Sequence, residues 1–189
     1  EGCTSLTSVT IGNSVTSIGG SAFSGCTSLV SVTISDSVTV IGAYAFEGCI
    51  SLISIEVSSD NKNYASVDGV LFNKDKSKLI TYPAGKTDSE YAIPNSVTSI
   101  GYGTFEDCTS LISVTIPDSV TSIDNKAFYN CTSLTSITIP NSVTEIGKDA
   151  FYNCTSLAKV DYNGTISQWK SISGYNNVSK IIKCIDGVI

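Results

Sequence analysis

Seven cysteines are the first residues of this sequence that could carry chemistry, because thiols form disulfides and bind metals. Six of them follow one another at intervals of 23, 23, 59, 23 and 23 along the chain. No zinc site has such spacing, and intervals this regular indicate one position of a sequence repeat. Cys184 stands outside the series, and we expect it to be a packed residue near the end of the fold. The six are Cys3, Cys26, Cys49, Cys108, Cys131 and Cys154.

Other groups offer little to catalysis. The sequence contains no His, and its 11 basic residues are all Lys, so the commonest general base and the bidentate phosphate clamp of Arg are both missing. The adjacent acids Glu106 and Asp107 have no orienting partner or oxyanion donor beside them. One loop could offer oxygens to Ca²⁺, but its spacing does not fit the 12-residue calcium loop. We predict no catalytic residue, no metal, no cofactor and no enzymatic activity. The loop residues are Asp60, Asn61, Asn63, Asp68 and Asp75.

A 23-residue repeat explains the cysteine spacing. Residues 111–133 and 134–156 are identical at 16 of 23 positions, and one unit, 52–87, is enlarged. The chain begins in the middle of a unit, so we expect it to be a piece of a longer protein. The units start at Leu6, Leu29, Leu52, Asp88, Leu111, Leu134 and Leu157.

The unit at 134–156 shows which elements would position these residues. Ile137 and Ile139 alternate with polar residues, which predicts a short strand with one buried face. A Pro-Asn-Ser turn and a second β-branched stretch, 143–146, follow, and no ten-residue helical pattern occurs. One unit cannot bury its apolar face alone, so units must stack and place like residues in columns about 4.8 Å apart. β-Carbons at that spacing are too far apart for good disulfide geometry, so we expect a ladder of reduced thiols.

The repeat resembles a known family. The pattern Leu-x-x-Val-x-Ile at Leu6, Leu29 and Leu111, with Ile-Pro-Asn-Ser-Val-Thr-x-Ile-Gly-x-x-Ala-Phe-x-x-Cys-Thr-Ser-Leu at 139–157, is similar to the BspA-like (Treponema-type) leucine-rich repeat over essentially the whole chain. The resemblance implies an α/β or mostly β solenoid, a right-handed stack of 23-residue rungs with short parallel strands. It also implies a bacterial cell-surface or secreted protein that mediates adhesion and carries no enzymatic residues.

The expected organisation is a solenoid over 1–162 and a C-terminal cap over 163–189. The enlarged unit should contain a hairpin, because the apolar stretches 70–73 and 79–82 flank a Lys-rich turn at 74–78. Trp169, the single Trp, is expected to cover the core of the last rung.

Two surfaces are candidates for binding. Around the hairpin, aromatic residues and lysines could serve recognition, or Phe72, Leu71 and Leu79 could pack the hairpin on the solenoid while the lysines keep its edge soluble. The outward strand positions form a flat face rich in Ser and Thr that suits an extended partner, although Thr also simply favours exposed strands. The residues are Tyr64, Phe72, Lys74, Lys76, Lys78 and Tyr82 for the hairpin, and Thr10, Thr33, Thr115 and Thr138 for the face.

Tyrosines near the Ala-Phe turns form a third, weaker pattern. Tyr129 and Tyr152 occupy one position in consecutive rungs and should stack, with Tyr44 and Tyr102 close to the same turns in other units. Such a strip could bind sugars or protein, and partial burial beside the phenylalanines is the plainer explanation.

Charge narrows the function further. The net charge of −6 argues against nucleic acid or an anionic membrane as partner, and no apolar run approaches the length of a membrane span. We therefore predict a non-catalytic adhesion module that recognises a protein, such as a host or neighbouring-cell surface protein. The alternative is a carbohydrate-binding solenoid module of a larger surface protein or enzyme. A third class, a β-helix enzyme, would require acids clustered with Arg or Lys on one face.

Overall fold

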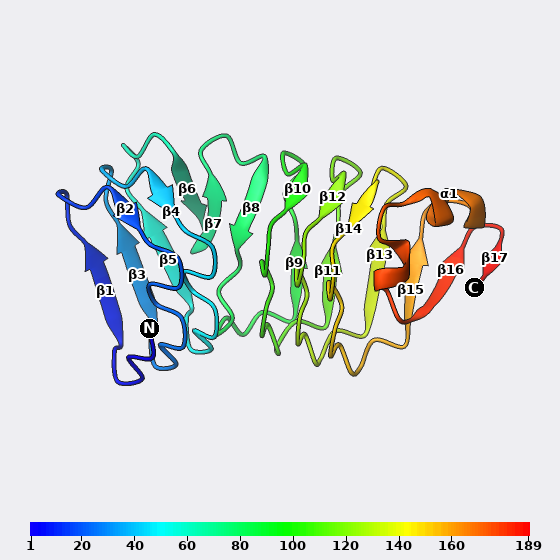
Figure 1. Cartoon of the computed structure of the whole chain (residues 1–189), viewed down its shortest axis with the longest axis horizontal. Helices are drawn as coiled ribbons and strands as arrows, with labels where there is room; N and C mark the ends of the chain where they lie inside the picture. Colours follow the sequence, from blue (N-terminus) through cyan, green and yellow to red (C-terminus); the bar gives the residue numbers. More distant parts are fainter. The chain divides into compact units, whose positions relative to one another are not determined.

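The computed structural model describes all residues, 1–189, as two compact units, Glu1–Lys86 and Thr87–Ile189. Each unit is a β-solenoid with little helix, in which the chain winds through successive rungs that follow the sequence repeat (Figure 1). The predicted fold class is therefore confirmed.

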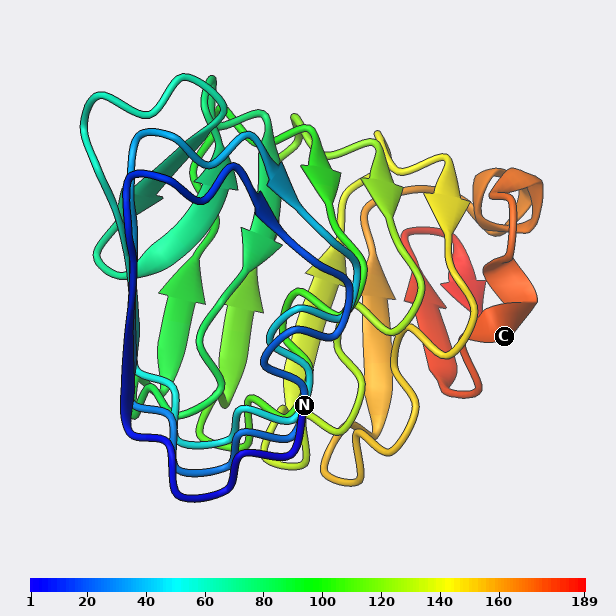
Figure 2. The ribbon, with the colours of Figure 1, turned by 60° about the vertical axis from the view of Figure 1, so that its left-hand side comes forward.

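The first unit is built on a parallel sheet in the order β1-β3-β5, formed by Ser8–Ile11, Ser31–Ile34 and Ser54–Val57. Val9 pairs with Val32 and Val32 with Ile55, so the register follows the 23-residue repeat. The second β-branched stretch of each rung forms a shorter ladder of β2 (Ser17–Ile18) and β4 (Val40–Ile41). Figure 2 shows these blue and cyan rungs tracing the same path one behind another.

The enlarged repeat contains the predicted hairpin and one strand more. β7 (Val70–Asn73) and β8 (Lys78–Thr81) pair antiparallel around the Lys-rich turn, as expected. β6 (Tyr64–Val67) also pairs antiparallel with β7, so the insertion is a three-stranded meander.

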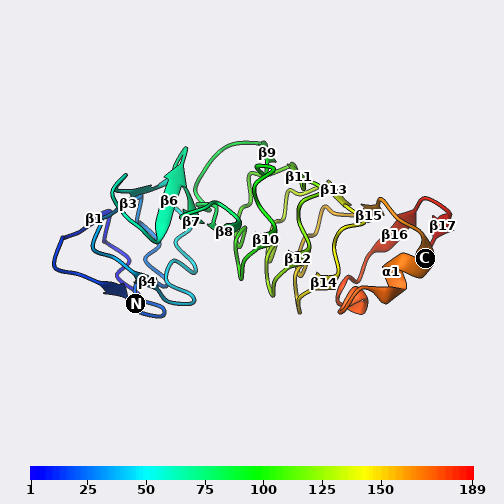
Figure 3. The same cartoon turned by 90° about the horizontal axis from the view of Figure 1, so that it is seen from above.

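The second unit repeats the same plan. Its main sheet runs β9-β11-β13-β15-β16-β17, and every neighbouring pair is parallel except the last. The short ladder is β10 (Ser99–Ile100), β12 (Ser122–Ile123) and β14 (Glu145–Ile146). Seen from above, the rungs from β9 to β15 follow one another at regular intervals (Figure 3). The main strands are Glu90–Ala92, Ser113–Thr115, Ser136–Ile139, Lys159–Tyr162, Ile181–Cys184 and Gly187–Val188.

The parallel ladder continues beyond Asn163, where the repeat pattern in the sequence ends. Lys159 pairs with Ile181, so this step of the ladder is one residue shorter than the repeat. Between β15 and β16 lie helix α1 (Ile166–Ser171), which has a capping box at its start, and the 3₁₀ turn Tyr175–Asn177. Trp169 is buried against Tyr162, with ring centroids 5.2 Å apart. The boundary between a solenoid and a cap at this point stays a prediction.

Columns of identical residues form the core of each unit. Phe23 stacks on Phe46 in the first unit, with ring centroids 5.8 Å apart. In the second unit Phe128 lies between Phe105, at 4.9 Å, and Phe151, at 5.2 Å, with interplanar angles of 6° and 5°. Offset stacking of near-parallel rings is a favoured aromatic contact, so the rung spacing places these side chains in a stabilising arrangement.

Candidate binding surfaces

The outward threonines lie in register within each unit. Thr10 pairs with Thr33 in the first unit, and Thr115 pairs with Thr138 in the second. All four are exposed, and paired parallel strands place such side chains about 4.8 Å apart. The structure therefore brings the predicted face together as two shorter faces, one on each unit.

The face of the second unit changes character toward β16 and β17. Beyond Thr138 the row continues with Asp161, which forms an ion pair with Lys159 at 2.9 Å. The next strand adds Ile181, which is 57% exposed, and Val188 on β17 is 61% exposed. Asp161 itself pairs with the exposed Lys183 on β16, so this end of the face mixes charged and apolar side chains.

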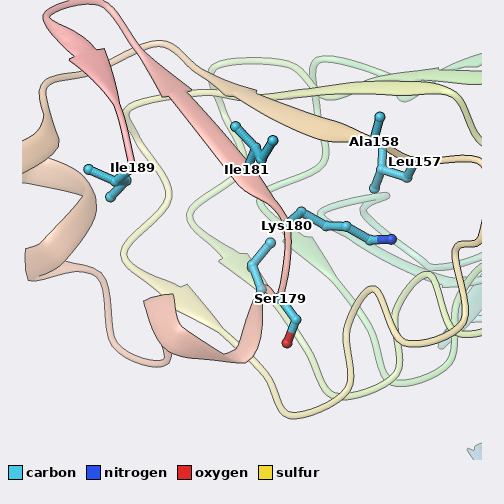
Figure 4. Close-up of a pocket in the computed structure, with 7 residues that line it drawn as sticks. Leu157, Ala158, Ser179, Lys180, Ile181 and Ile189 are labelled. Atoms are coloured by element: carbon cyan, nitrogen blue, oxygen red, sulfur yellow. The ribbon is translucent and has the colours of Figure 1, made fainter.

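A shallow, open pocket of about 600 Å³ lies beside these residues, and Figure 4 shows its lining. The Lys180 ammonium donates a hydrogen bond to the Cys154 carbonyl at 3.0 Å, which holds this side chain against the last regular rung. Sequence reasoning missed the pocket, because β16 joins the sheet out of step with the repeat. The lining residues are Leu157, Ala158, Val178, Ser179, Lys180, Ile181 and Ile189.

The hairpin candidates are only partly available to a partner. Phe72 is fully buried and Tyr82 is 2% exposed, so including these two side chains in a contact surface was wrong; both pack inside the first unit. Tyr64 is half-buried, and its hydroxyl accepts a hydrogen bond from the Ile41 backbone N–H at 2.9 Å.

The exposed part of the hairpin is its set of lysines. Lys74, Lys76 and Lys78 are all exposed, and the Lys74 ammonium donates to the Ser59 carbonyl at 3.2 Å. These three lysines stay a candidate contact.

One residue of the proposed calcium loop has a structural role instead. Asn61 is fully buried; its Nδ2 donates to the carbonyls of Ser35 and Val38, and its Oδ1 accepts from the backbone N–H groups of Asn63 and Tyr64. All polar atoms of this side chain are therefore engaged within the protein.

The repeat cysteines form the expected ladder of free thiols. The thiols of Cys49, Cys131 and Cys154 each donate to a phenylalanine carbonyl of the preceding rung at 3.0 Å. Burial raises the pKa of Cys49 to about 11 and holds the pKa of Cys108 well above its usual value. A hydrogen bond with the Cys131 thiol lowers the pKa of Cys154, whose side chain is nevertheless fully buried. Because a reactive thiolate must be accessible, the buried cysteines act as small packing residues.

The aromatic strip is most complete in the second unit. Tyr129 and Tyr152 stack with centroids 5.2 Å apart and an interplanar angle of 16°, as their repeat position predicts. The Lys126 ammonium lies 5.1 Å from the Tyr129 ring centroid and 3.8 Å from a Glu106 carboxylate oxygen. Tyr152 is 58% exposed.

A chain of amide hydrogen bonds runs beside the tyrosines. Asn153 Nδ2 donates to Asn130 Oδ1 at 2.6 Å, and Asn130 Nδ2 donates to Asp107 Oδ1 at 2.5 Å. All three residues have positive φ, between 56° and 61°, a conformation that Asn and Asp tolerate better than most residues. In the sequence, this row of hydrogen bonds is indicated by the Asn or Asp that precedes each repeat cysteine of the second unit.

Comparison with known proteins supports the family assignment. The model of the BspA type leucine rich repeat region matches residues 1–87 and 84–185. Among the curated proteins no sequence matches the chain. None of its helices has the length and apolar character needed to cross a bilayer.

Two solved bacterial structures are similar to the chain. A leucine-rich repeat protein from Eubacterium ventriosum shares 30% identity over 86% of this chain and 55% of that protein, with a TM-score of 0.70. The pneumococcal vaccine antigen PcpA shares 25% identity over 85% of this chain and 52% of that protein, with a TM-score of 0.67. The chain thus spans about half the length of these relatives.

Proposed function

The chain belongs to the BspA-type leucine-rich repeat family, and from this premise we propose that it is a non-catalytic adhesion module that binds a protein partner on the outward face of its parallel sheets. The observation that supports this proposal is the register of the second unit. Thr115 and Thr138 lie side by side on exposed strands and lead to the pocket beside Ile181.

This arrangement has the composition of a protein-binding surface. Short hydroxyl side chains lose little rotamer entropy when a partner covers them, and their strands are already paired through the backbone. Protein interfaces combine apolar anchors in pockets with a polar rim. Here the shallow pocket between Leu157 and Ile189 offers apolar side chains beside Ser179 and Lys180, and the threonines with the Lys159–Asp161 pair would form the rim.

We propose a surface protein of a host or neighbouring cell as the partner and a bacterial cell surface or secreted location for the module. The similarity to PcpA, which is described as a pneumococcal vaccine antigen, supports a setting in contact with a host. The net charge of −6 further favours a protein over nucleic acid as the partner.

A binding assay on extracellular-matrix extract tests the proposal. The immobilised chain should retain matrix proteins, and treating the extract with protease should abolish the retention. The double variant Thr115→Lys/Thr138→Lys places two long, charged side chains on the flat face. We expect it to lose most of the retained protein, because unpaired charges at an interface must be desolvated.

Matched controls carry the same charges elsewhere. Asn95 and Asn141 are exposed turn residues at equivalent repeat positions, so Asn95→Lys/Asn141→Lys adds the same charge off the strand face. This control should retain the matrix proteins as well as the unaltered chain does. Equal retention by both double variants would refute the proposed face, and retention that survives protease treatment would refute a protein partner.

A further inference from the structure

We propose that Tyr152 and Asn153 form a binding subsite for a neutral β-linked pyranose glycan. The subsite lies at the Ala-Phe turn of the second unit and not on the strand face proposed for protein binding. It is a further binding activity of this chain, so it can fail without affecting that proposal.

The first argument is the exposure and rigidity of one aromatic ring. Tyr152 stacks on Tyr129 at 5.2 Å, and the Lys126 ammonium lies 5.1 Å from the Tyr129 ring centroid. One face of Tyr152 is therefore backed by a fixed ring, while 58% of the residue is exposed. A ring that is already ordered loses little entropy when a ligand covers it.

The second argument is a polarised acceptor beside that ring. Asn153 donates to Asn130, and Asn130 donates to the Asp107 carboxylate. Hydrogen bonds in a chain polarise one another, and a bond to a carboxylate is the strongest kind in the series. Nδ2 of Asn153 is turned toward Asn130. The Oδ1 of Asn153 therefore points to the other side of the amide, where it can accept a hydrogen bond from a ligand hydroxyl.

The repeat places the two groups at the same end of the stack. Tyr152 stacks on the tyrosine of the preceding rung, and Asn153 bonds to the asparagine of that same rung. The ring and the amide group therefore lie on the same rung, next to each other in sequence and in the turn. Both residues are exposed, so part of each is accessible to a ligand.

The chemistry of this pair favours a sugar. A β-glucopyranose has all its hydroxyls equatorial, so its axial C–H groups form flat apolar faces that stack on an aromatic ring while the hydroxyls at its edge form hydrogen bonds. The Lys126 ammonium lies 5.1 Å from the Tyr129 ring centroid and pairs with Glu106 at 3.8 Å, and the Lys180 ammonium donates to the Cys154 carbonyl at 3.0 Å. Because both ammonium groups are engaged within the protein, we expect a neutral ligand. A sugar with an axial hydroxyl on the stacking face would fit less well.

Saturation-transfer NMR with a β-1,4-linked glucose hexasaccharide at millimolar concentration tests the subsite. We expect transfer from protein to the sugar C–H protons, and weaker transfer to an α-linked mannose hexasaccharide. Tyr152→Ala should reduce the affinity about ten-fold, because the ring contact is lost. Tyr152→Phe keeps the ring and should bind within about two-fold of the unaltered chain.

The acceptor has its own matched variants. Gly2, Gly25 and Gly48 occupy the same repeat position as Asn153 with positive φ, so Asn153→Gly removes the amide without backbone strain. It should weaken binding about three- to ten-fold, the worth of one hydrogen bond. Asn130→Gly leaves Asn153 in place and breaks the chain to Asp107, and we expect a smaller loss of about two-fold.

The controls separate binding from folding. Tyr44→Ala removes an exposed tyrosine of the first unit and should leave the affinity unchanged, with circular dichroism showing that each variant is folded. Absence of transfer to the β-1,4-linked glucose hexasaccharide would overturn the proposal. Transfer that is equal in Tyr152→Ala and the unaltered chain would overturn it as well.

Discussion

At the scale of single residues, the position before each repeat cysteine shows how one backbone requirement admits two solutions. It has positive φ in every rung, with Gly at 2, 25 and 48 in the first unit. In the second unit Asp107, Asn130 and Asn153 take the same conformation and add a hydrogen-bonded side-chain ladder. Gly adopts the positive φ without steric cost because it has no β-carbon. Asn also tolerates this conformation, and its side chain forms hydrogen bonds to the neighbouring rungs.

Substitution of Asn130 separates these two contributions. Asn130→Gly should lower the free energy of unfolding by about 1 kcal/mol, for the lost side-chain bonds. Asn130→Ala should lower it by about 2–3 kcal/mol, because Ala loses the same bonds and also strains the left-handed backbone. Urea unfolding followed by circular dichroism measures both values. Equal losses would show that the positive φ relaxes without cost.

The cysteines give a second prediction at this scale. A maleimide reagent at pH 7 should label the folded chain once, at Cys3, which is the single exposed cysteine. The other six should react only after denaturation, because they are buried, and burial raises the pKa of Cys49 and Cys108. Mass spectrometry counts the labels, and Cys3→Ser should abolish rapid labelling. Rapid labelling at a second site would contradict the ladder of packed thiols.

At the scale of elements, the inserted meander depends on one buried amide. Asn61 bridges the turn after β3 and the start of β6 through four hydrogen bonds. Asn61→Asp keeps the acceptor but replaces the donor with an oxygen facing two carbonyls. It should cost about 3 kcal/mol at pH 7, as expected for buried carbonyls left unsatisfied by a charged group.

The pH dependence of this variant provides a specific signature. A protonated carboxyl can donate again, so the destabilisation should shrink as the pH falls toward about 3.9, the ordinary pKa of Asp. Chemical unfolding at a series of pH values tests this trend. Asn63→Asp is the control, because that side chain is exposed, and it should change stability by less than about 0.5 kcal/mol. A destabilisation of Asn61→Asp that does not vary with pH would contradict the proposed donor role.

The elements also show what the sequence could predict. Strand positions and register followed from the 23-residue period, because identical rungs must stack in register. For Phe72 the sequence left both a contact surface and packing of the hairpin open, and the structure shows packing, because Leu71 and Phe72 are successive and both fully buried. A strand covered on both faces loses the alternation from which an exposed side is inferred. The pocket was missed for a related reason, since β16 joins the sheet where the step between paired strands is one residue shorter than the repeat.

At the scale of the whole molecule, the stability of a repeat protein does not come from one central hydrophobic core. Each rung contacts only the rungs beside it, so its energy is the sum of rung and neighbour terms. Candidate binding groups accordingly lie where the repetition changes: the lysines of the enlarged unit, the pocket at β16, and the tyrosine column that ends at Tyr152. The outward threonines, by contrast, belong to the regular rungs, so both the repeat and its interruptions contribute candidate binding groups.

This locality leads to a prediction that compares the two units. Phe128→Ala removes the middle ring of the column in the second unit and should cost about 3–5 kcal/mol there. Trp169 is the single Trp and lies in this unit, so its fluorescence reports the unfolding of these rungs. Maleimide labelling of Cys49, in a Cys3→Ser background, reports the opening of the first unit. The urea midpoint from Trp169 should fall strongly, while the protection of Cys49 should change much less.

The reciprocal variant completes the comparison. Phe46→Ala disrupts the stacked pair of the first unit and should release Cys49 at lower urea while leaving the Trp169 midpoint nearly unchanged. Opposite responses of the two reporters are what nearest-neighbour coupling requires, because a defect weakens its own rungs and their neighbours first. If either substitution shifted both midpoints by the same amount, the chain would unfold as one cooperative body and the local description of its stability would be wrong.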